Sequence, residues 1–492
     1  MNTMLFFRKQ MFIVSVLALL LTPACRRELL DQAPDEQISD ATAFDTPDRI
    51  EKLRFGLYDA LKAPSMYGSR FMVYSDIRGE EFLNEGMQTG NGLQVWNHSL
   101  DAFFPEVTEV WTAGYAIING CNIFIDGIQK NKAVLHNDQL AIQYEAEAKF
   151  IRGLTYYCLL TLYARPYPDG NGAKPGLILR LLPEPGSSNK NQSRTTVAAV
   201  YDQILEDLDF ARDNLPLNRG NDYGNTTLAH RNTAIALKTR VLLTMGRYQD
   251  LITEASTIVS ATAPFVATGQ GVPNALQDDI LRVFSSPYTT LENIFSLPNT
   301  AADPLYLQRA AASYYNPPPN GLGDYSLNPN GILMDAAFAA TDDRRQFVFD
   351  NPENNKPYLI KYPTGTPHTD YVPVIRYAEV LLNLSEAHAR TAGLSQRAVD
   401  LLNAVRGRSN PAGVYALSDF ASADALIAAI LKERRIELMG EGFRSNDCTR
   451  LLLPIPGKGN IATIQPNDTR YIWPIPSNEL DTNDFCEQNP GY

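Results

Sequence analysis

Histidine and cysteine are scarce in this sequence, each contributing 5 of the 492 residues. The cysteines form no C-x-x-C pair and the histidines show no metal-ligand spacing, so we expect no metal site and no cofactor. Motifs typical of hydrolases, metalloproteases and nucleotide-binding proteins (G-x-S-x-G, H-E-x-x-H and the P-loop) are missing as well. The adjacent Glu80 and Glu81 do not suit a glycosidase, which needs carboxylates on opposite sides of the sugar. The sequence therefore predicts a protein that is not an enzyme.

An excess of positive charge is also missing. The formal net charge is −12 at pH 7, and no basic cluster interrupts this balance. We expect no nucleic-acid partner, because phosphate binding needs a concentrated patch of Lys and Arg. The hydrophobic content of 44% and the charged content of 20% are typical of globular proteins. Tyr (24) and Phe (21) are abundant, which fits either a helical core or exposed platforms for stacking.

The N-terminus carries a targeting signal. Arg8 and Lys9 precede an apolar run from Met11 to Leu21, which is too short for a membrane-spanning helix, so residues 1–24 are predicted to be a secretory signal peptide. Ala24 before Cys25 resembles a lipoprotein cleavage site, with Cys25 as the lipidated residue. Residues 25–45 are then a polar tether on a lipid anchor, which holds a protein on a membrane without crossing it. A coincidental cysteine after an ordinary signal is the alternative.

Helical periodicity dominates the rest of the chain. Helix starts, apolar stripes and stops predict four antiparallel helix pairs: 46–62 with 106–129, 138–163 with 196–213, 231–245 with 249–260, and 376–391 with 395–408. Gly114 lies on the apolar side of its helix, where a missing side chain lets a neighbouring helix approach. Helix pairs stacked side by side are typical of tetratricopeptide arrays. The predicted fold is mainly α, with a few short strands near 293–297 and 357–362.

Two segments lack helical periodicity, about 64–105 and 261–372, and connections of such length are usually functional or disordered. A sugar site needs flat aromatic rings for the apolar C–H faces and polar groups in the ring plane for hydroxyls. The first segment supplies Trp96 as the best candidate for an exposed aromatic. Internal packing of the tyrosines is the alternative interpretation. The candidate ligand-binding residues are Trp96, Asn97, Asp76 and Arg78 in the first segment, and Tyr306, Tyr314, Tyr315 and Tyr325 in the second.

The densest charge pattern lies between Glu433 and Arg450, where four arginines and four carboxylates occur among apolar residues. Ser422 is the predicted N-cap of a helix that ends at Gly440 and Gly442. We interpret the charges as bidentate pairs that join the helix end to the following loop, a scaffold rather than a sugar site. Among the cysteines, Cys121 and Cys158 are expected to be buried thiols, and pairing of Cys448 with Cys486 in an oxidising compartment is a hypothesis.

This run, E-R-R-I-E-L from Glu433 and E-G-F-R from Glu441 with Asp447 and Arg450, resembles a signature of the SusD-like (RagB) family of outer-membrane nutrient-binding lipoproteins. R-Y-A-E-V-L-L from Arg376 and L-N-A-V-R from Leu402 also resemble family motifs. The resemblance implies a tetratricopeptide-like, right-handed superhelical spine with an irregular, loop-rich half. It also implies one domain over 46–492, with an N-terminal part of about 46–260 and a C-terminal part of about 261–492.

Functionally, the resemblance implies a cell-surface protein, lipid-anchored in the outer membrane, that captures an oligosaccharide and passes it to a SusC-like TonB-dependent transporter. Structural calcium is known in some relatives, but this sequence offers no ligand set for it. Two other interpretations stay open. The protein could bind peptides within the same family, or it could be a tetratricopeptide-type scaffold for protein partners, in which case the aromatic segments are buried.

Overall fold

The computed structural model describes residues 42–86, 90–184, 186, 191–305 and 310–492. The predicted signal peptide, Cys25, most of the tether and Tyr306 lie outside these ranges. The fold is helix-rich with a few short strands, as predicted. Within the described ranges, none of the helices combines the length and apolar character needed to cross a lipid bilayer.

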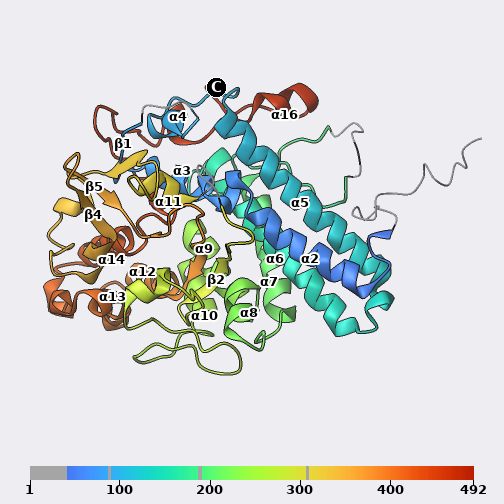
Figure 1. Ribbon diagram of the computed structural model, residues 1–492, viewed down its shortest axis with the longest axis horizontal. Helices are drawn as coiled ribbons and strands as arrows, with labels where there is room; N and C mark the ends of the chain where they lie inside the picture. Colours follow the sequence, from blue (N-terminus) through green and yellow to red (C-terminus); the bar gives the residue numbers. More distant parts are fainter. Residues whose placement is uncertain (1–41, 87–89, 185, 187–190, 306–309) are drawn as a thin grey trace, which may run out of the picture.

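Both long and short helices are present in the chain (Figure 1). The long helices are α2 (Pro47–Leu61), α5 (Pro105–Asn131), α6 (Asp138–Tyr163), α7 (Val197–Asn214), α9 (Arg231–Met245), α12 (Tyr377–Ala392), α13 (Gln396–Ser409) and α14 (Ala423–Glu437). The short ones are α3 (Arg70–Ile77), α4 (Leu93–Trp96), α8 (Asp222–Thr227), α10 (Tyr248–Ala255), α11 (Ala311–Tyr315), α15 (Arg444–Thr449) and α16 (Ser477–Thr482).

Neighbouring helices pack in the predicted pairs. Helix α6 packs on α7, α9 on α10, and α12 on α13, whereas α2 contacts both α5 and α6. In Figure 1, α2, α5, α6 and α7 lie side by side at one end of the molecule, and α12, α13 and α14 lie at the other. This stacking is consistent with a tetratricopeptide-like spine.

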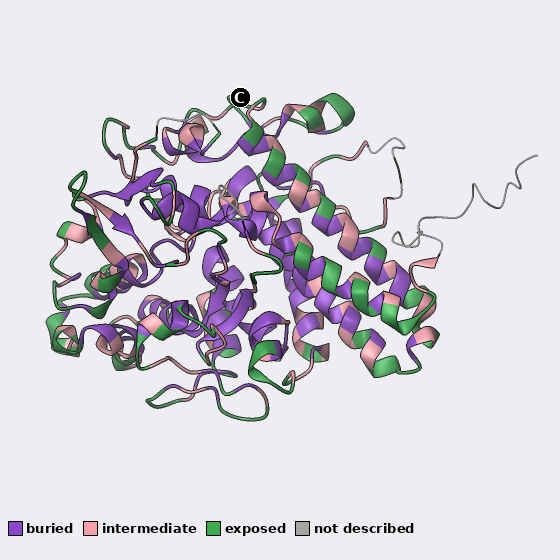
Figure 2. Cartoon of the chain, in the orientation of Figure 1, coloured by how far each residue is buried: buried purple, intermediate pink, exposed green. Residues whose placement is uncertain are grey.

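A glycine sets the close packing of α5 on α6. A Cβ atom built at Gly114 would lie 2.7 Å from Leu159 Cδ2, so only glycine fits at this crossing. The start of α6 is capped by Asn137, whose Oδ1 accepts a hydrogen bond from Leu140 N at 3.0 Å. In Figure 2, buried and exposed residues alternate around α2 and α5, so that each helix has a buried side and an exposed side.

The described strands pair antiparallel in two-stranded sheets. Strand β1 (Phe82–Asn84) pairs with β3 (Tyr325–Leu327), β2 (Asn293–Leu297) with β6 (Val372–Arg376), and β4 (Val348–Asn351) with β5 (Lys356–Leu359). Strand β2 has the predicted bounds and β5 overlaps the predicted strand. Strand β6 was not predicted. It pairs with β2 antiparallel, so that Leu297 at the end of β2 lies opposite Val372 at the start of β6.

The segment 64–105 is not irregular, contrary to the prediction. It contains a π-turn at Pro64–Gly68, then α3, β1 and α4. Helix α3 packs against α4, α11 and α15, and its residues from Phe71 to Ile77 are all buried. The periodicity of this segment is weak because nearly every side chain of α3 faces protein, so that no polar face marks the helix.

The cysteines of the described residues are separate thiols. Cys121 and Cys158 are buried within the helices, as predicted. Cys448 and Cys486 are also free and buried, so the hypothesis that they form a disulfide is wrong. Cys448 instead belongs to a small apolar cluster with Ile455, Ile464 and Tyr471.

Candidate functional site

Trp96 is part of the core, so the prediction of an exposed aromatic at this position is wrong. Its side chain is only 7% exposed, and Nε1 donates a hydrogen bond to Phe82 O at 2.9 Å. The short helix α4 turns Val95 and Trp96 inward together. Neighbouring Asn97 is half-buried and shapes the following turn, since its Oδ1 accepts hydrogen bonds from Ser99 N at 3.2 Å and Oγ at 2.6 Å.

Asp76 and Arg78 join the first segment to the C-terminal part of the chain. Asp76, which is 2% exposed, accepts hydrogen bonds from Gly442 N at 2.8 Å and Arg444 N at 3.3 Å. Burial raises the pKa of Asp76 to about 7. Arg78 is equally buried and donates to Tyr471 O at 2.9 Å. Neither side chain is free to take a sugar hydroxyl.

The predicted tyrosines of the second segment are fully buried as well. The ring of Tyr315 stacks on Phe82 with centroids 4.7 Å apart, and the Tyr325 hydroxyl donates to Asn91 O at 2.8 Å. Tyr314 receives a hydrogen bond from Arg70 Nε at 3.4 Å. These rings pack the interior, which is the alternative that the sequence left open. Tyr306 lies outside the described residues.

The charge-dense segment forms a buried network, as predicted. The carboxylate of Glu437 accepts from Arg376 at 2.9 Å, Arg408 at 2.5 Å and Arg344 at 3.0 Å. Burial opposes ionisation of Glu437, but the surrounding guanidinium groups hold its pKa well below the usual range. We call these residues and their partners the charge network. Its other buried pairs are Arg434–Asp447, Arg450–Asp447, Arg450–Glu386, Arg376–Glu441, Arg376–Glu292, Arg408–Glu292, Arg344–Glu433, Arg406–Glu433 and Lys361–Glu441.

A pair of tyrosines is held together at the surface beside the β2–β6 sheet. The rings of Tyr288 and Tyr371 stack with centroids 4.8 Å apart and planes 17° from parallel, and both residues are half-buried. Tyr223, at the start of α8, is 53% exposed and close enough to contribute to raising the pKa of Tyr371, after the larger effect of burial. We call Tyr223, Tyr288 and Tyr371 the tyrosine platform.

A carboxylate fixes the position of Tyr288 in this platform. The Tyr288 hydroxyl donates to Asp370 Oδ1 at 2.9 Å, and Asp370 also accepts from Thr364 N at 2.9 Å and Oγ1 at 2.7 Å. Burial, together with the nearby Asp370, raises the pKa of Tyr288, so its hydroxyl stays protonated. The backbone of Tyr288 is left-handed (φ 63°), a conformation that costs a non-glycine residue about 1–3 kcal/mol.

The sequence analysis missed the tyrosine platform. Its members come from three distant segments, and local sequence does not show that Tyr288 and Tyr371 meet. The available signal was modest. Tyr288 follows Ser286-Pro287 and Tyr371 follows Asp370, so that each ring stands next to turn-forming or polar residues rather than in an apolar stripe.

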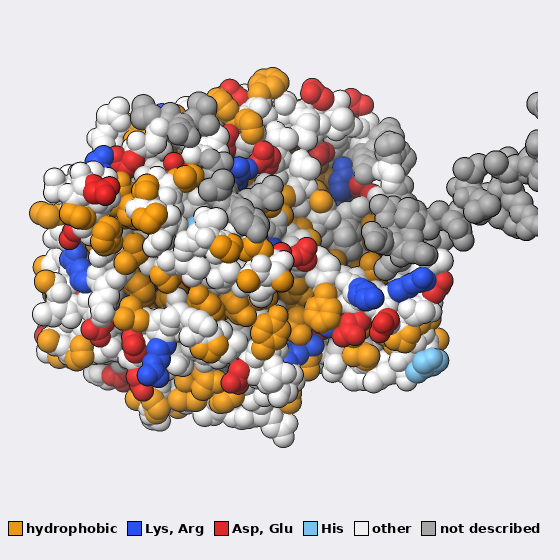
Figure 3. Space-filling view, viewed as in Figure 1, with side chains coloured by type: hydrophobic (Ala, Val, Ile, Leu, Met, Phe, Trp, Pro, Cys, Tyr) orange, Lys and Arg blue, Asp and Glu red, His pale blue; other side chains and the backbone are white. Residues whose placement is uncertain are grey.

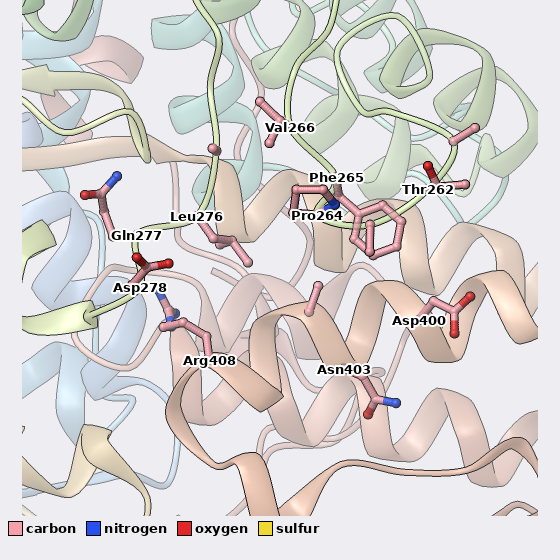
Figure 4. A pocket seen from close by; sticks show the side chains of 14 residues that line it. Thr262, Pro264, Phe265, Val266, Leu276, Gln277, Asp278, Asp400, Asn403 and Arg408 are labelled. Atoms are coloured by element: carbon pink, nitrogen blue, oxygen red, sulfur yellow. The ribbon is translucent and has the colours of Figure 1, made fainter.

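A cavity of about 870 Å³ lies between the segment 261–278 and α13 (Figure 4). Two of its polar side chains are bonded to other parts of the protein. Asn403 exchanges hydrogen bonds with the backbone of Tyr415, and Arg408 is bound to Glu292 and Glu437. Phe265, the aromatic residue of the lining, is only 3% exposed. The lining therefore offers no exposed aromatic ring on which a sugar could stack.

Comparison with known proteins identifies the family. A SusD superfamily protein from Bacteroides fragilis superposes with a TM-score of 0.80 and is 31% identical, with 90% of this chain and 100% of that chain covered. The chain belongs to the SusD family. The family model described as "SusD family" matches residues 358–492, and the one described as "Starch-binding associating with outer membrane" matches residues 28–243.

Other SusD-like proteins are similar over nearly the whole chain. SusD-like protein P2 of Formosa agariphila is 25% identical, with 94% of this chain and 96% of the relative covered. A structure titled "Laminarin binding SusD-like protein" shares the fold with a TM-score of 0.70 at 20% identity, covering 91% of this chain and all of its own.

Several residues that carried the resemblance, among them Arg376, Glu433, Glu437 and Glu441, lie in the charge network. Structural calcium is known in some relatives. In the described part of this chain, His, Cys, Asp and Glu side chains do not form a group of three or more that could hold a metal ion.

Proposed function

We propose that this protein is a cell-surface glycan-binding lipoprotein. It captures an oligosaccharide and delivers it to a SusC-like TonB-dependent transporter in the outer membrane. The observation that carries the proposal is the match to a SusD superfamily structure over 90% of the chain. The starch-binding description of the model over residues 28–243 and the laminarin-binding neighbour support a glycan as the ligand.

The described geometry supports binding rather than catalysis. Glu80 and Glu81 are the adjacent carboxylates that were considered above as a glycosidase pair. Glu80 is bound by Arg444 at 2.6 Å and by Arg435 at 2.9 Å, and Glu81 is bound by Arg435. Both carboxylates are more than nine-tenths buried. Side chains held in this way position α14 and α15 and do not serve as a general acid or a nucleophile.

Titration of the purified mature protein with soluble starch, laminarin and a set of neutral and acidic oligosaccharides tests glycan capture. The expected result is saturable binding of at least one glycan with no change in its chain length after prolonged incubation. Binding of peptides with no glycan bound would favour the peptide-binding alternative, and shortened glycan products would contradict a non-enzymatic role.

Delivery and anchoring need the full chain in an outer-membrane bacterium. The expected result is that the wild type incorporates an alkyne-labelled fatty acid and co-purifies with a TonB-dependent transporter, whereas Cys25→Ala incorporates no label and leaves the membrane fraction. A labelled Cys25→Ala protein would contradict anchoring at this residue. Absence of the transporter from the purified membrane complex would contradict delivery.

One observation favours a second candidate, the scaffold for protein partners. That interpretation predicts buried aromatic segments, and Trp96, Tyr314, Tyr315 and Tyr325 are indeed buried. It also predicts that deletion of residues 84–103 leaves function intact, yet this deletion removes α4 and Trp96 from the core and should unfold the chain. The glycan titration is therefore the better discriminator, since a scaffold binds no sugar.

A further inference from the structure

We infer that the tyrosine platform is the surface on which this protein stacks a neutral oligosaccharide. The inference rests on the proposed glycan-binding function and names the site within it. Neither the sequence pattern nor the family comparisons mark Tyr223, Tyr288 or Tyr371. The stacked pair, the carboxylate behind it and the exposed third ring mark them instead.

The platform has the shape that a sugar needs. A pyranose presents an apolar face of C–H groups, which packs on a flat aromatic ring, and a rim of hydroxyls, which needs donors and acceptors nearby. Tyr288 and Tyr371 support each other as a stacked pair, and Tyr223 adds an exposed ring on α8, which packs against β2. Figure 3 shows hydrophobic side chains gathered over α8 and β2 in the middle of this face.

The platform is also held rigidly before any ligand binds. Asp370 fixes the Tyr288 hydroxyl, and Asn299 Nδ2 in turn donates to Asp370 O at 2.8 Å. Both Asp370 and Asn299 are more than nine-tenths buried. Because the rings are already ordered, binding loses little side-chain entropy. The left-handed backbone of Tyr288 is held by Asn293, whose Nδ2 donates a hydrogen bond to Tyr288 O at 2.7 Å.

The charges around the platform favour a neutral glycan over an acidic one. The polar partner of Tyr288 is the carboxylate of Asp370, and the residue before Tyr223 is the exposed Asp222. Uncharged side chains lie beside it as well, since Thr364 binds Asp370 and Thr289 follows Tyr288 in the chain. A uronic acid on these rings would face like charges in a protein whose net charge is already −12.

Other exposed aromatic residues lack this combination. Phe103, Phe485 and Phe349 are 78%, 58% and 40% exposed, but among the described residues none of them stacks on a second aromatic ring as Tyr288 does on Tyr371. Phe55, which is 44% exposed, lies against the guanidinium of Arg54 at 4.1 Å. The tyrosine platform is therefore the best candidate among the described aromatic surfaces.

The test compares ring removal with hydroxyl removal in the mature protein, using the neutral and acidic oligosaccharides of the titration above. Each of Tyr288→Ala and Tyr371→Ala should raise Kd by about tenfold or more, and the double variant should bind below detection. Tyr371→Phe keeps the ring and should stay within about threefold of the wild type. Phe349→Ala removes an exposed aromatic residue on β4 and is the matched control, with unchanged Kd.

The outcomes separate the site from the function. If the wild type binds a neutral glycan and the alanine variants bind it equally well while folded, the platform assignment is wrong and the proposed function stands. If Phe103→Ala abolishes binding and the platform variants do not, the site lies elsewhere. If the wild type binds acidic glycans only, or peptides only, the inference fails. If it binds no member of the panel, the function fails with it.

Discussion

The charge network and the tyrosine platform use polar groups in opposite ways. In the network, the side chains of Glu437 and its arginine partners Arg344, Arg376 and Arg408 are buried and paired with one another. In the platform, one buried carboxylate, Asp370, holds rings that remain half-exposed. The region of highest charge density in this chain is therefore structural, and we call it, together with the packed core, the frame. We assign ligand recognition to the uncharged rings of the tyrosine platform, which the frame holds in position.

The largest effect should follow from removing Glu437. Glu437→Ala leaves three buried guanidinium groups short of a partner, and we expect a loss of about 5 kcal/mol in the free energy of unfolding. Denaturant unfolding at pH 7 measures it. Asp250→Ala breaks the exposed pair with Arg247 (53% and 42% side-chain exposure) and is the matched control, with an expected loss below about 0.5 kcal/mol. Equal losses in both variants would show that burial does not distinguish the network.

Trp96 sharpens the comparison, because the sequence analysis assigned it to recognition and the structure places it in the frame. Trp96→Ala removes a core ring and its hydrogen bond to Phe82 O, and should cost about 3 kcal/mol of stability. Glycan affinity, measured at a temperature where the variant remains folded, should be unchanged. A drop in affinity at unchanged stability would return Trp96 to the binding surface.

Proton linkage distinguishes two kinds of carboxylate within the frame. The folded protein keeps a proton on Asp76 up to pH about 7, whereas the unfolded chain releases it near pH 4. The folded state therefore binds more protons in this window, and Asp76 makes stability fall as pH rises, by up to about 1.4 kcal/mol per pH unit. Asp76→Asn should lose this slope between pH 4.5 and 7, as measured by unfolding at each pH.

Asp447 should behave in the opposite sense. Burial opposes its ionisation, but Arg434 and Arg450 lower its pKa to about 2, so its stabilising contribution is present above pH 4 and lost as pH falls towards 2.

For Asp76, an Asp76→Asn variant with the same pH slope as the wild type would contradict a buried, protonated carboxyl at this position.

The smallest effect on stability belongs to the platform. Tyr223→Ala changes a side chain that is 53% exposed on a short helix, and its free energy of unfolding should stay within about 0.5 kcal/mol of the wild type. Thermal unfolding measures this. A loss comparable to that of Trp96→Ala would mean that the ring is structural, and would break the distinction between frame and platform.

The sequence predicted much of the frame because local chemistry determines it. Ser422 caps α14 by accepting from Ala425 N at 3.2 Å, and the helix is followed by left-handed Gly440 (φ 81°) and Gly442 (φ 85°), as the pattern indicated. The network was predicted only in kind. Which arginine meets Glu437 depends on residues 29 to 93 positions away, and spacing alone does not reveal them.

The candidate site could not be predicted in the same way, because tertiary pairing decides which rings are exposed. Trp96 was predicted to be exposed in an irregular segment, but it belongs to helix α4, which directs its ring into the core. The signal at Tyr371 was weak, because Pro373 lies in the strand that follows it and a proline inside a run argues against a strand. Tyr314 and Tyr315 are followed by three prolines but lie in a short helix inside the protein.

The hydrogen bonds from Gly442 and Arg444 to Asp76 span 366 and 368 positions of the chain, and the bond from Arg78 to Tyr471 spans 393. Early and late segments of the polypeptide thus complete each other. Until the last portion has been synthesised, Asp76 in helix α3 lacks the backbone N–H groups of Gly442 and Arg444 as hydrogen-bond donors. Such long-range closure makes folding slow and leaves the nascent chain open to aggregation and proteolysis. Loss of the residues after Gly442 would therefore affect the beginning of the molecule as severely as its end.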